Sequence, residues 1–287
     1  MTEFFIAGGV MLTLGVVLSG ILAVANRKLY VYEDPRIDVV EERLPSANCG
    51  ACGFAGCRAF AEAVVAGTAS PSQCTASSAD MVQSIAEYLG VDPGGAEKRV
   101  ARLACAGGNH VARRFALYSG IPSCRAAGLV AGGGKSCTWG CLGQGDCVRA
   151  CPFDAIHMND VALPVVDEDK CTACGNCVVA CPKNLFSIHP ISHRLWVSCS
   201  TRLRAKAAKE ACAAACIGCG LCAKDAPDVI AMQDNLPVVD YTKNELAAQD
   251  AIQRCPTGAI VWLMPGGEVL RGEKASVPES RESLPIG

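Results

Sequence analysis

The sequence predicts an α+β protein in which one N-terminal transmembrane helix precedes a series of small, cysteine-rich modules. Residues 4–25 contain no charged side chain, which predicts the helix. The 287-residue chain has 20 cysteines but only 7 Phe, 5 Tyr and 3 Trp, so large side chains are too few for one extensive core. The length allows two or three domains. Small modules stabilised by bound metal are therefore expected.

Residues 1–28 are predicted to be a membrane anchor. At a rise of about 1.5 Å per residue, the uncharged run can cross a hydrocarbon core about 30 Å thick. A cleaved signal peptide is the alternative, but the start of the chain lacks a positive n-region and the run exceeds a typical h-region. Arg27 and Lys28 follow the run, and Glu3 precedes it. The positive-inside rule therefore predicts a single-pass protein of the cytoplasmic (inner) membrane, with most of the chain on the cytoplasmic side.

Residues 29–44 are predicted to be a solvated linker, because the segment is rich in charged side chains and contains Pro35. A small four-cysteine domain, residues 45–92, follows with the spacing C-x2-C-x4-C-x16-C. Its candidate metal ligands are Cys49, Cys52, Cys57 and Cys74. Neighbouring glycines give the backbone freedom that a tight metal loop requires. An iron–sulfur cluster is the favoured occupant, and zinc is the alternative because four thiolates also suit it.

The most specific motif is C-x2-C-x2-C-x3-C-P at residues 171–182. In two-cluster ferredoxins, the first three cysteines of such a run bind one 4Fe-4S cluster and the fourth, before proline, reaches a second cluster. Zinc sites usually arrange their thiolates as two pairs instead. The close spacing of the cysteines also favours metal binding over disulfides. Electron transfer through iron–sulfur clusters is therefore the working hypothesis.

From Cys105 onward the sequence repeats with a period near 75 residues. The cysteine spacing of residues 124–141 recurs at 199–216, and Leu-Pro-Val-Val-Asp occurs at 163–167 and again at 236–240. Two tandem ferredoxin-like modules of the 2x 4Fe-4S type are therefore predicted. Their expected boundaries are 93–192 and 193–265, with a C-terminal tail at 266–287. Short strands are expected at 155–158, 185–188, 229–232 and 259–262.

The repeat also predicts which cysteines share a cluster. The first module supplies one complete set, Cys151, Cys171, Cys174 and Cys177. The second module supplies another, Cys216, Cys219, Cys222 and Cys255. The second copy lacks a second triplet, and Ala226 replaces its crossing cysteine, so both halves of one site are absent together. A further first-module set needs a fourth thiol because position 144 is Gln; its members are Cys141, Cys147 and Cys181, with Cys137 as the nearest fourth.

Four cysteines are left over, and they are candidates for a fifth cluster between the modules: Cys105, Cys124, Cys199 and Cys212. The alternative is that some are ordinary buried thiols. Cys137 and Cys212 occupy equivalent repeat positions, so their assignments could exchange. At least four clusters, or five, are thus expected. The four histidines are single and are interpreted as surface or core residues. No catalytic residues are predicted.

The formal net charge of −2 gives no indication of nucleic-acid binding. Two groups of basic residues are candidates for docking an acidic protein, although a solvated helical face is the alternative. The group in the second module is Arg202, Arg204, Lys206 and Lys209. The group in the first module is Arg113, Arg114 and Arg125.

The chain resembles the B subunit of the Rnf complex, the membrane-bound, ion-translocating ferredoxin:NAD oxidoreductase. The resemblance spans nearly the whole chain. It comprises the N-terminal helix, the motif Cys-Gly-Ala-Cys-Gly-x-x-Gly-Cys at 49–57 with Cys74, and the long-form ferredoxin region that begins with Cys-Ala-Gly-Gly at 105–108. The order of these parts is more distinctive than the four-cysteine domain, which is similar to one in corrinoid iron–sulfur proteins.

This resemblance implies an electron-relay subunit of a translocase with no substrate site of its own. Electrons from reduced ferredoxin would enter here and pass to other subunits that carry flavins and further iron–sulfur centres. Those subunits would couple the redox drop to Na⁺ or H⁺ transport, and NAD would be reduced on one of them. Two alternatives are a membrane-anchored polyferredoxin that serves another oxidoreductase without ion pumping, and a structural zinc-binding adaptor.

Overall fold

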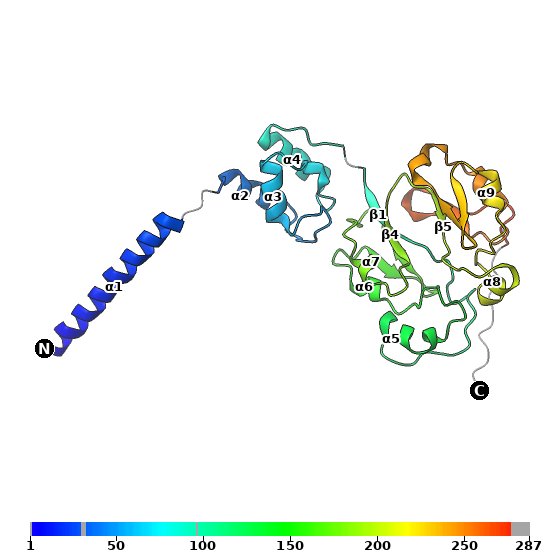
Figure 1. Cartoon of the computed structure of the whole chain (residues 1–287), viewed down its shortest axis with the longest axis horizontal. Coiled ribbons are helices and arrows are strands. Elements are labelled where there is room, and N and C mark those ends of the chain that lie inside the picture. Colours follow the sequence, from blue (N-terminus) through cyan, green and yellow to red (C-terminus); the bar gives the residue numbers. More distant parts are fainter. Residues whose placement is uncertain (1, 30–32, 96, 277–287) are drawn as a thin grey trace.

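The computed structural model describes residues 2–29, 33–95 and 97–276 (Figure 1). Residues 30–32 of the expected linker and 277–287 of the expected tail lie outside the described residues. The predicted N-terminal helix is confirmed as α1 (Thr2–Leu29). Its segment Gly8–Leu29 has a mean hydropathy of 2.2 and is not buried by other described parts of the chain. By length and composition this segment can cross a membrane.

The next domain is helical and contains α2 (Pro35–Glu42), α3 (Cys57–Val65), η1 (Pro71–Gln73) and α4 (Ala79–Leu89). The expectation of a solvated linker is wrong for residues 35–44, because α2 packs into this domain. Val40 and Leu44 are buried against Phe60. Ile37 and Val40 lie on one face of α2, and Leu44 continues their spacing two residues beyond the end of the helix.

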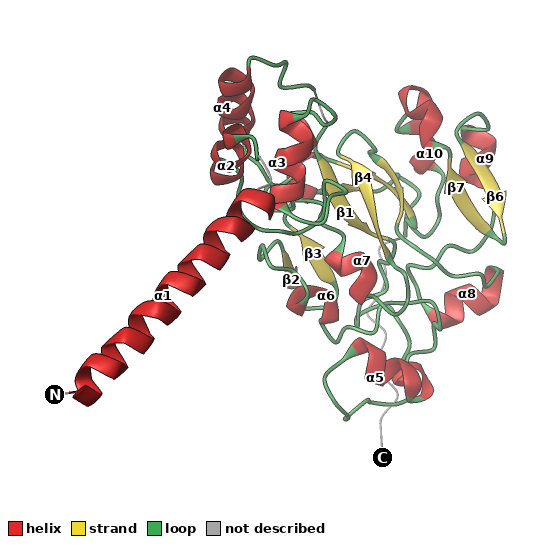
Figure 2. Ribbon diagram, turned by 60° about the vertical axis from the view of Figure 1, so that its left-hand side comes forward, coloured by secondary structure: helices red, strands yellow, loops and turns green. Residues whose placement is uncertain are grey.

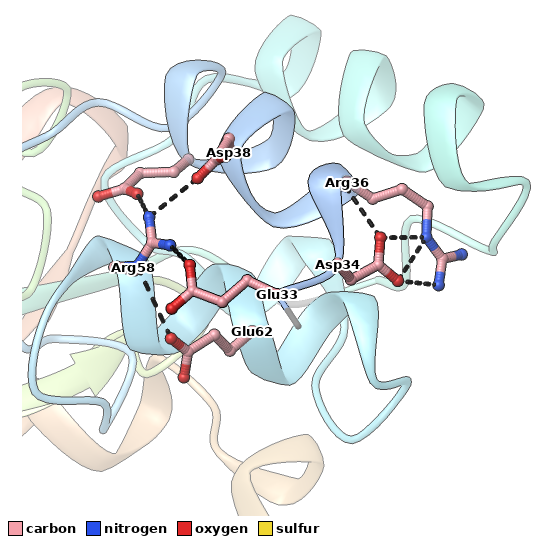
Figure 3. Close-up of polar contacts among 7 residues, drawn as sticks. Glu33, Asp34, Arg36, Asp38, Arg58 and Glu62 are labelled. Atoms are coloured by element: carbon pink, nitrogen blue, oxygen red, sulfur yellow. Dashed lines mark hydrogen bonds and ion pairs between the residues drawn. The ribbon is translucent and has the colours of Figure 1, made fainter. Parts of the chain in front are cut away.

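The charged residues of α2 form ion pairs on its other face (Figure 3). Arg58 of α3 donates to Asp38 and Glu41 across 3.0 and 2.8 Å, and to Glu33 across 2.5 Å. The side chain of Arg58 is 41% exposed, so solvent screens these pairs and each one stabilises the domain only weakly. The charges that suggested a solvated linker therefore help to orient α2 on α3.

The remaining chain forms two modules built from antiparallel strand pairs (Figure 2). In the first module β1 (Arg99–Leu103) pairs with β4 (Phe186–Pro190), and β2 (Ile156–Met158) pairs with β3 (Pro164–Val166). In the second module β5 (Leu195–Val197) pairs with β8 (Ile260–Leu263), which also pairs with β9 (Val269–Leu270), and β6 (Ile230–Gln233) pairs with β7 (Leu236–Val239). The four expected strand positions are thus confirmed in β2, β4, β6 and β8.

Short helices connect these strands. The first module contains α5 (Cys124–Leu129), η2 (Ala131–Gly134), α6 (Asp146–Arg149) and α7 (Asn176–Ala180). The second contains α8 (Ala205–Ala211), α9 (Leu221–Asp225), η3 (Tyr241–Leu246), α10 (Asp250–Gln253) and η4 (Pro265–Gly267).

The strand pairs correct one detail of the repeat alignment. Cys105 follows β1 by two residues and Cys199 follows β5 by two residues, and β1 pairs with β4 as β5 pairs with β8. Cys105, rather than Cys124, is therefore the structural counterpart of Cys199. Cys124 belongs to an additional segment of the first module that contains α5 and η2.

Candidate iron–sulfur cluster sites

The 20 cysteines line five hollows, four in each. In the N-terminal domain the N-domain site contains Cys49, Cys52, Cys57 and Cys74. In the first module the triplet site contains Cys151, Cys171, Cys174 and Cys177, and the α5 site contains Cys124, Cys141, Cys147 and Cys181. In the second module the C-module site contains Cys216, Cys219, Cys222 and Cys255. The intermodule site contains Cys105, Cys137, Cys199 and Cys212.

Three of these sets are the ones expected from spacing, and two differ from it by one exchange. The structure places Cys124, and not Cys137, with Cys141, Cys147 and Cys181. Cys137 lines the intermodule site instead. The extra segment explains the exchange, since α5 brings its first residue to the hollow whose loop carries Gln144 in place of a thiol.

Asp146 holds α5 by hydrogen bonds next to the loop that carries Cys141 and Cys147. Its Oδ2 accepts from Ser123 Oγ at 3.0 Å and from Arg125 N at 3.2 Å. Asp146 is also the first residue of α6, which carries Cys147. The sequence signal for this arrangement is the longer distance from Cys105 to Cys137 than from Cys199 to Cys212.

The backbone of the ligand loops is shaped for buried sulfur atoms. Gly175 and Gly220 have φ values of 82° and 71° and immediately precede the helices that carry Cys177 and Cys222, as their N-caps. This left-handed conformation favours glycine.

Backbone amides point at several sulfur atoms. Within the first module, Ala101 N donates to Cys171 Sγ at 3.4 Å and Leu185 N donates to Cys181 Sγ at 3.5 Å. Hydrogen bonds to cluster sulfurs are one means by which proteins set cluster potentials.

Burial raises the pKa of many of these thiols. It raises the pKa of Cys141, Cys147, Cys177, Cys199 and Cys222 to about 12, and that of Cys212 and Cys216 to about 11. Without metal these thiols are protonated at neutral pH. Metal coordination supplies the positive charge that makes a buried thiolate stable, so metal binding releases protons.

The intermodule site draws two thiols from each module. Cys141 N donates to Cys105 Sγ at 3.4 Å, and Cys216 N donates to Cys199 Sγ at 3.3 Å. The two hydrogen bonds join equivalent positions of the repeat. The intermodule site therefore lies where the pseudo-symmetry that relates the two modules brings equivalent residues together. Each contact also connects the intermodule site to a neighbouring site, because Cys141 lines the α5 site and Cys216 lines the C-module site.

The other sites continue this row. The α5 and triplet sites share α6 and the chain that follows it, since Cys147 lies in α6 and Cys151 two residues beyond its end. Thr75 Oγ1 donates to Thr172 O at 2.5 Å, which joins the loop of the N-domain site to that of the triplet site. At the other end, Cys219 of the C-module site is the one exposed cysteine of the 20.

Two of the histidines interpreted as single residues lie together. His189 Nδ1 and His193 Nδ1 are 3.2 Å apart, and His193 stacks on Tyr241 with ring centroids 4.1 Å apart. Trp196 contacts the edge of His189. Burial, and then His193, lower the pKa of His189 to about 4. These rings are packing residues between β4, β5 and η3.

The donor sets fit 4Fe-4S clusters, which take four cysteine thiolates each. Within the described residues, no group of three or more Cys, His, Asp or Glu side chains is arranged closely enough to hold a single metal ion. Three family profiles match the chain. They are described as "Putative Fe-S cluster" at residues 44–76, "4Fe-4S dicluster domain" at 136–185 and "4Fe-4S single cluster domain of Ferredoxin I" at 213–262. The fold and its sites thus define an iron–sulfur protein of the 4Fe-4S type.

Curated relatives extend this result over most of the chain. The B subunit of the Na(+)-translocating ferredoxin:NAD(+) oxidoreductase complex of Acetobacterium woodii is 39% identical over 88% of this chain and 76% of its own length. The B subunit of the proton-translocating complex of Clostridium ljungdahlii is 39% identical over 92% and 94%. The B subunit of the ion-translocating oxidoreductase complex of Methanosarcina acetivorans is 36% identical over 86% and 94%. The chain belongs to the family of Rnf complex B subunits, which confirms the resemblance.

Proposed function

We propose that this chain relays electrons through five 4Fe-4S clusters within a membrane-bound, ion-translocating ferredoxin:NAD oxidoreductase complex. The observation that carries the proposal is the row of five hollows, each lined by four cysteines and connected to the next by shared ligand segments or a hydrogen bond. Bound clusters supply one-electron redox chemistry. The chain's own residues hold the clusters in order, surround them with apolar side chains and direct amide N–H groups at their sulfurs.

The family supports the complex. The relatives from A. woodii and C. ljungdahlii are named as subunits of ferredoxin:NAD(+) oxidoreductase complexes that translocate Na⁺ and protons, respectively. The partners of this chain are accordingly reduced ferredoxin and the other subunits of such a complex. The helix α1 anchors it as a single-pass protein, and Arg27 and Lys28 keep the cluster-binding part on the cytoplasmic side of the inner membrane.

The C-module site is the proposed entry point for electrons. Its ligand Cys219 is exposed, whereas the other cysteines are buried or partly buried. Arg204 lies beside the loop of this site at Gly218. Of the expected docking residues, Arg202 pairs with Asp234, and Lys206 lies 3.7 Å from Glu210. Arg204 and Lys209 therefore contribute most of the positive charge that attracts an acidic ferredoxin.

Rapid-mixing kinetics with reduced ferredoxin test this entry point. At low ionic strength, ferredoxin should reduce the double variant Arg204→Glu and Lys209→Glu at a rate at least about tenfold lower than that of the native chain. This difference in rate should shrink as salt is added. Reduction by a small chemical reductant should stay normal. The matched control is Arg113→Glu with Arg125→Glu, which reverses two charges of the first module: Arg125 lies in α5, and Arg113 N donates to Ala211 O of α8. A slower rate in the control and an unchanged rate in the first variant would move the entry point to the first module.

A further inference from the structure

Lys135 is a buried charge without a carboxylate partner. It is 4% exposed, and within the described residues the only other buried charged side chains, Arg102 and Glu168, pair with each other. Lys135 Nζ donates to Cys141 O at 2.6 Å and to Gly107 O. Two carbonyl groups satisfy hydrogen bonds of the ammonium but do not neutralise it. A buried ammonium normally requires a negative counter-charge.

The intermodule site supplies that counter-charge when it holds a cluster. Lys135 lines the same hollow as Cys105, Cys137, Cys199 and Cys212. Four thiolates around a 4Fe-4S core give the cluster a net negative charge, and the buried surroundings screen the attraction to Lys135 poorly.

Only the first module has a lysine at this position of the repeat. Lys135 precedes Cys137 by two residues, and the residue that precedes Cys212 by two is Glu210. The side chain of Glu210 is 58% exposed and lies near Lys206, outside the hollow. Among the residues that line the five hollows, Lys183 at the α5 site is the other lysine. Its Nζ donates to Thr138 O at an exposed position.

We propose that Lys135 is a positioning residue that raises the reduction potential of the intermodule cluster. Reduction adds one electron to the cluster, and a fixed positive charge in the same buried hollow stabilises the more negative, reduced form. The inference rests on the proposed relay. Because the intermodule site lies between the α5 site and the C-module site, Lys135 favours arrival of an electron at the boundary between the modules.

EPR-monitored redox titration of the full chain tests this role, with iron counted in the same samples. In Lys135→Gln, which keeps a donor but removes the charge, the signal of one cluster should titrate at a lower potential and the other signals should not move. Lys135→Arg should restore the native value. The matched control is Lys243→Gln, an exposed lysine whose Nζ also donates to a carbonyl, at 3.2 Å. It should leave all potentials unchanged. Cys137→Ser identifies the intermodule signal, because that signal should be lost or altered.

The outcomes separate the two proposals. Unchanged potentials in an iron-replete Lys135→Gln variant would overturn the role of Lys135 and leave the relay intact. If Lys135→Gln loses about four irons per chain and Lys135→Arg retains them, the charge is needed to hold the cluster, which overturns a role confined to its potential. Loss in both variants would show a packing role and overturn it. A native chain without the four irons of this site would instead contradict the five-cluster relay itself.

Discussion

The two modules share one fold but differ in how they accommodate missing thiols. In the first module Gln144 stands where the second has Cys219, and α5 brings Cys124 to complete the site. In the second module the triplet and the crossing cysteine of one site are both missing, and apolar core residues occupy the position of that site. Counting back from the shared Cys-Pro, Ala251 stands where the first module has Cys177. Ala251 and Ile252 are buried there, 1% and 0% exposed.

This difference indicates what each arrangement requires. A hollow with three thiols would still provide four ligands for a cluster when another segment supplies the fourth. A hollow that has lost its triplet and its crossing cysteine is filled by apolar side chains, which then stabilise the module by hydrophobic packing. The first module should therefore depend on bound clusters for its folding more than the second does.

The largest expected effects come from the ligands that distinguish the modules. Cys124→Ala and Cys181→Ala should alter the same EPR signal, because both residues line the α5 site. Cys137→Ala should alter the signal that Cys199→Ala alters. Each variant should lose about four irons or retain a three-iron centre. A Cys137→Ala spectrum that matches Cys181→Ala would restore the assignment by spacing and contradict the geometry.

A rescue experiment sharpens the same comparison. Gln144→Cys in a Cys124→Ala background rebuilds the ligand loop of the second module inside the first. Iron content should rise again by up to about four atoms per chain relative to Cys124→Ala alone. Gln144→Ser is the control, since serine is a poor substitute for a thiolate ligand. Equal iron contents in the two double variants would show that position 144 does not face the α5 site.

A smaller effect is expected from the apolar replacement in the second module. Ile252→Ala removes a fully buried side chain from the cluster that contains Leu195 and Val229. The unfolding free energy should fall by about 2 to 5 kcal/mol, measured by denaturant titration of the anaerobic protein. The iron content should not change. Loss of iron together with stability would show that the module still depends on its metal for this part of the core.

The smallest effect concerns the fastening of α5. Asp146→Ala removes the acceptor for Ser123 Oγ and Arg125 N and should cost about 1 to 3 kcal/mol of unfolding free energy. The second module has Leu221 at the equivalent position. The matched control in the second module is Asp225→Ala, which breaks an exposed pair with Arg254 and should cost less unfolding free energy than Asp146→Ala. Equal costs in both modules would show that α5 does not depend on Asp146.

Local spacing accounts for the features that the sequence predicted well. The apolar run, the strands after the Cys-Pro positions and three of the five cysteine groups depend on residues close together in the chain. The exchange of Cys124 and Cys137 was missed because the same x12 interval occurs in both repeats. The longer distance from Cys105 to Cys137 becomes informative only when the strand register aligns Cys105 with Cys199. The packing of α2 was missed because the many charged residues of this segment suggested a linker, although Ile37, Val40 and Leu44 recur at intervals of three and four residues.

Other features depend on burial that arises only in the folded chain. Lys135 is one of 26 basic residues, and nothing in its neighbours distinguishes it from a surface lysine. Its position in the intermodule hollow follows from the approach of segments of the two modules that are far apart in the sequence. The contact of His189 with Tyr241 has the same origin.

The central claim is that all 20 cysteines hold iron in five sites of four. A count of iron and acid-labile sulfide per chain, on protein purified without oxygen, tests it most directly. We expect about 20 of each per chain, and about 16 of each in Cys137→Ala if the cluster is lost completely. A native chain with about 16 of each would contradict the claim, because one of the five hollows would then contain no cluster.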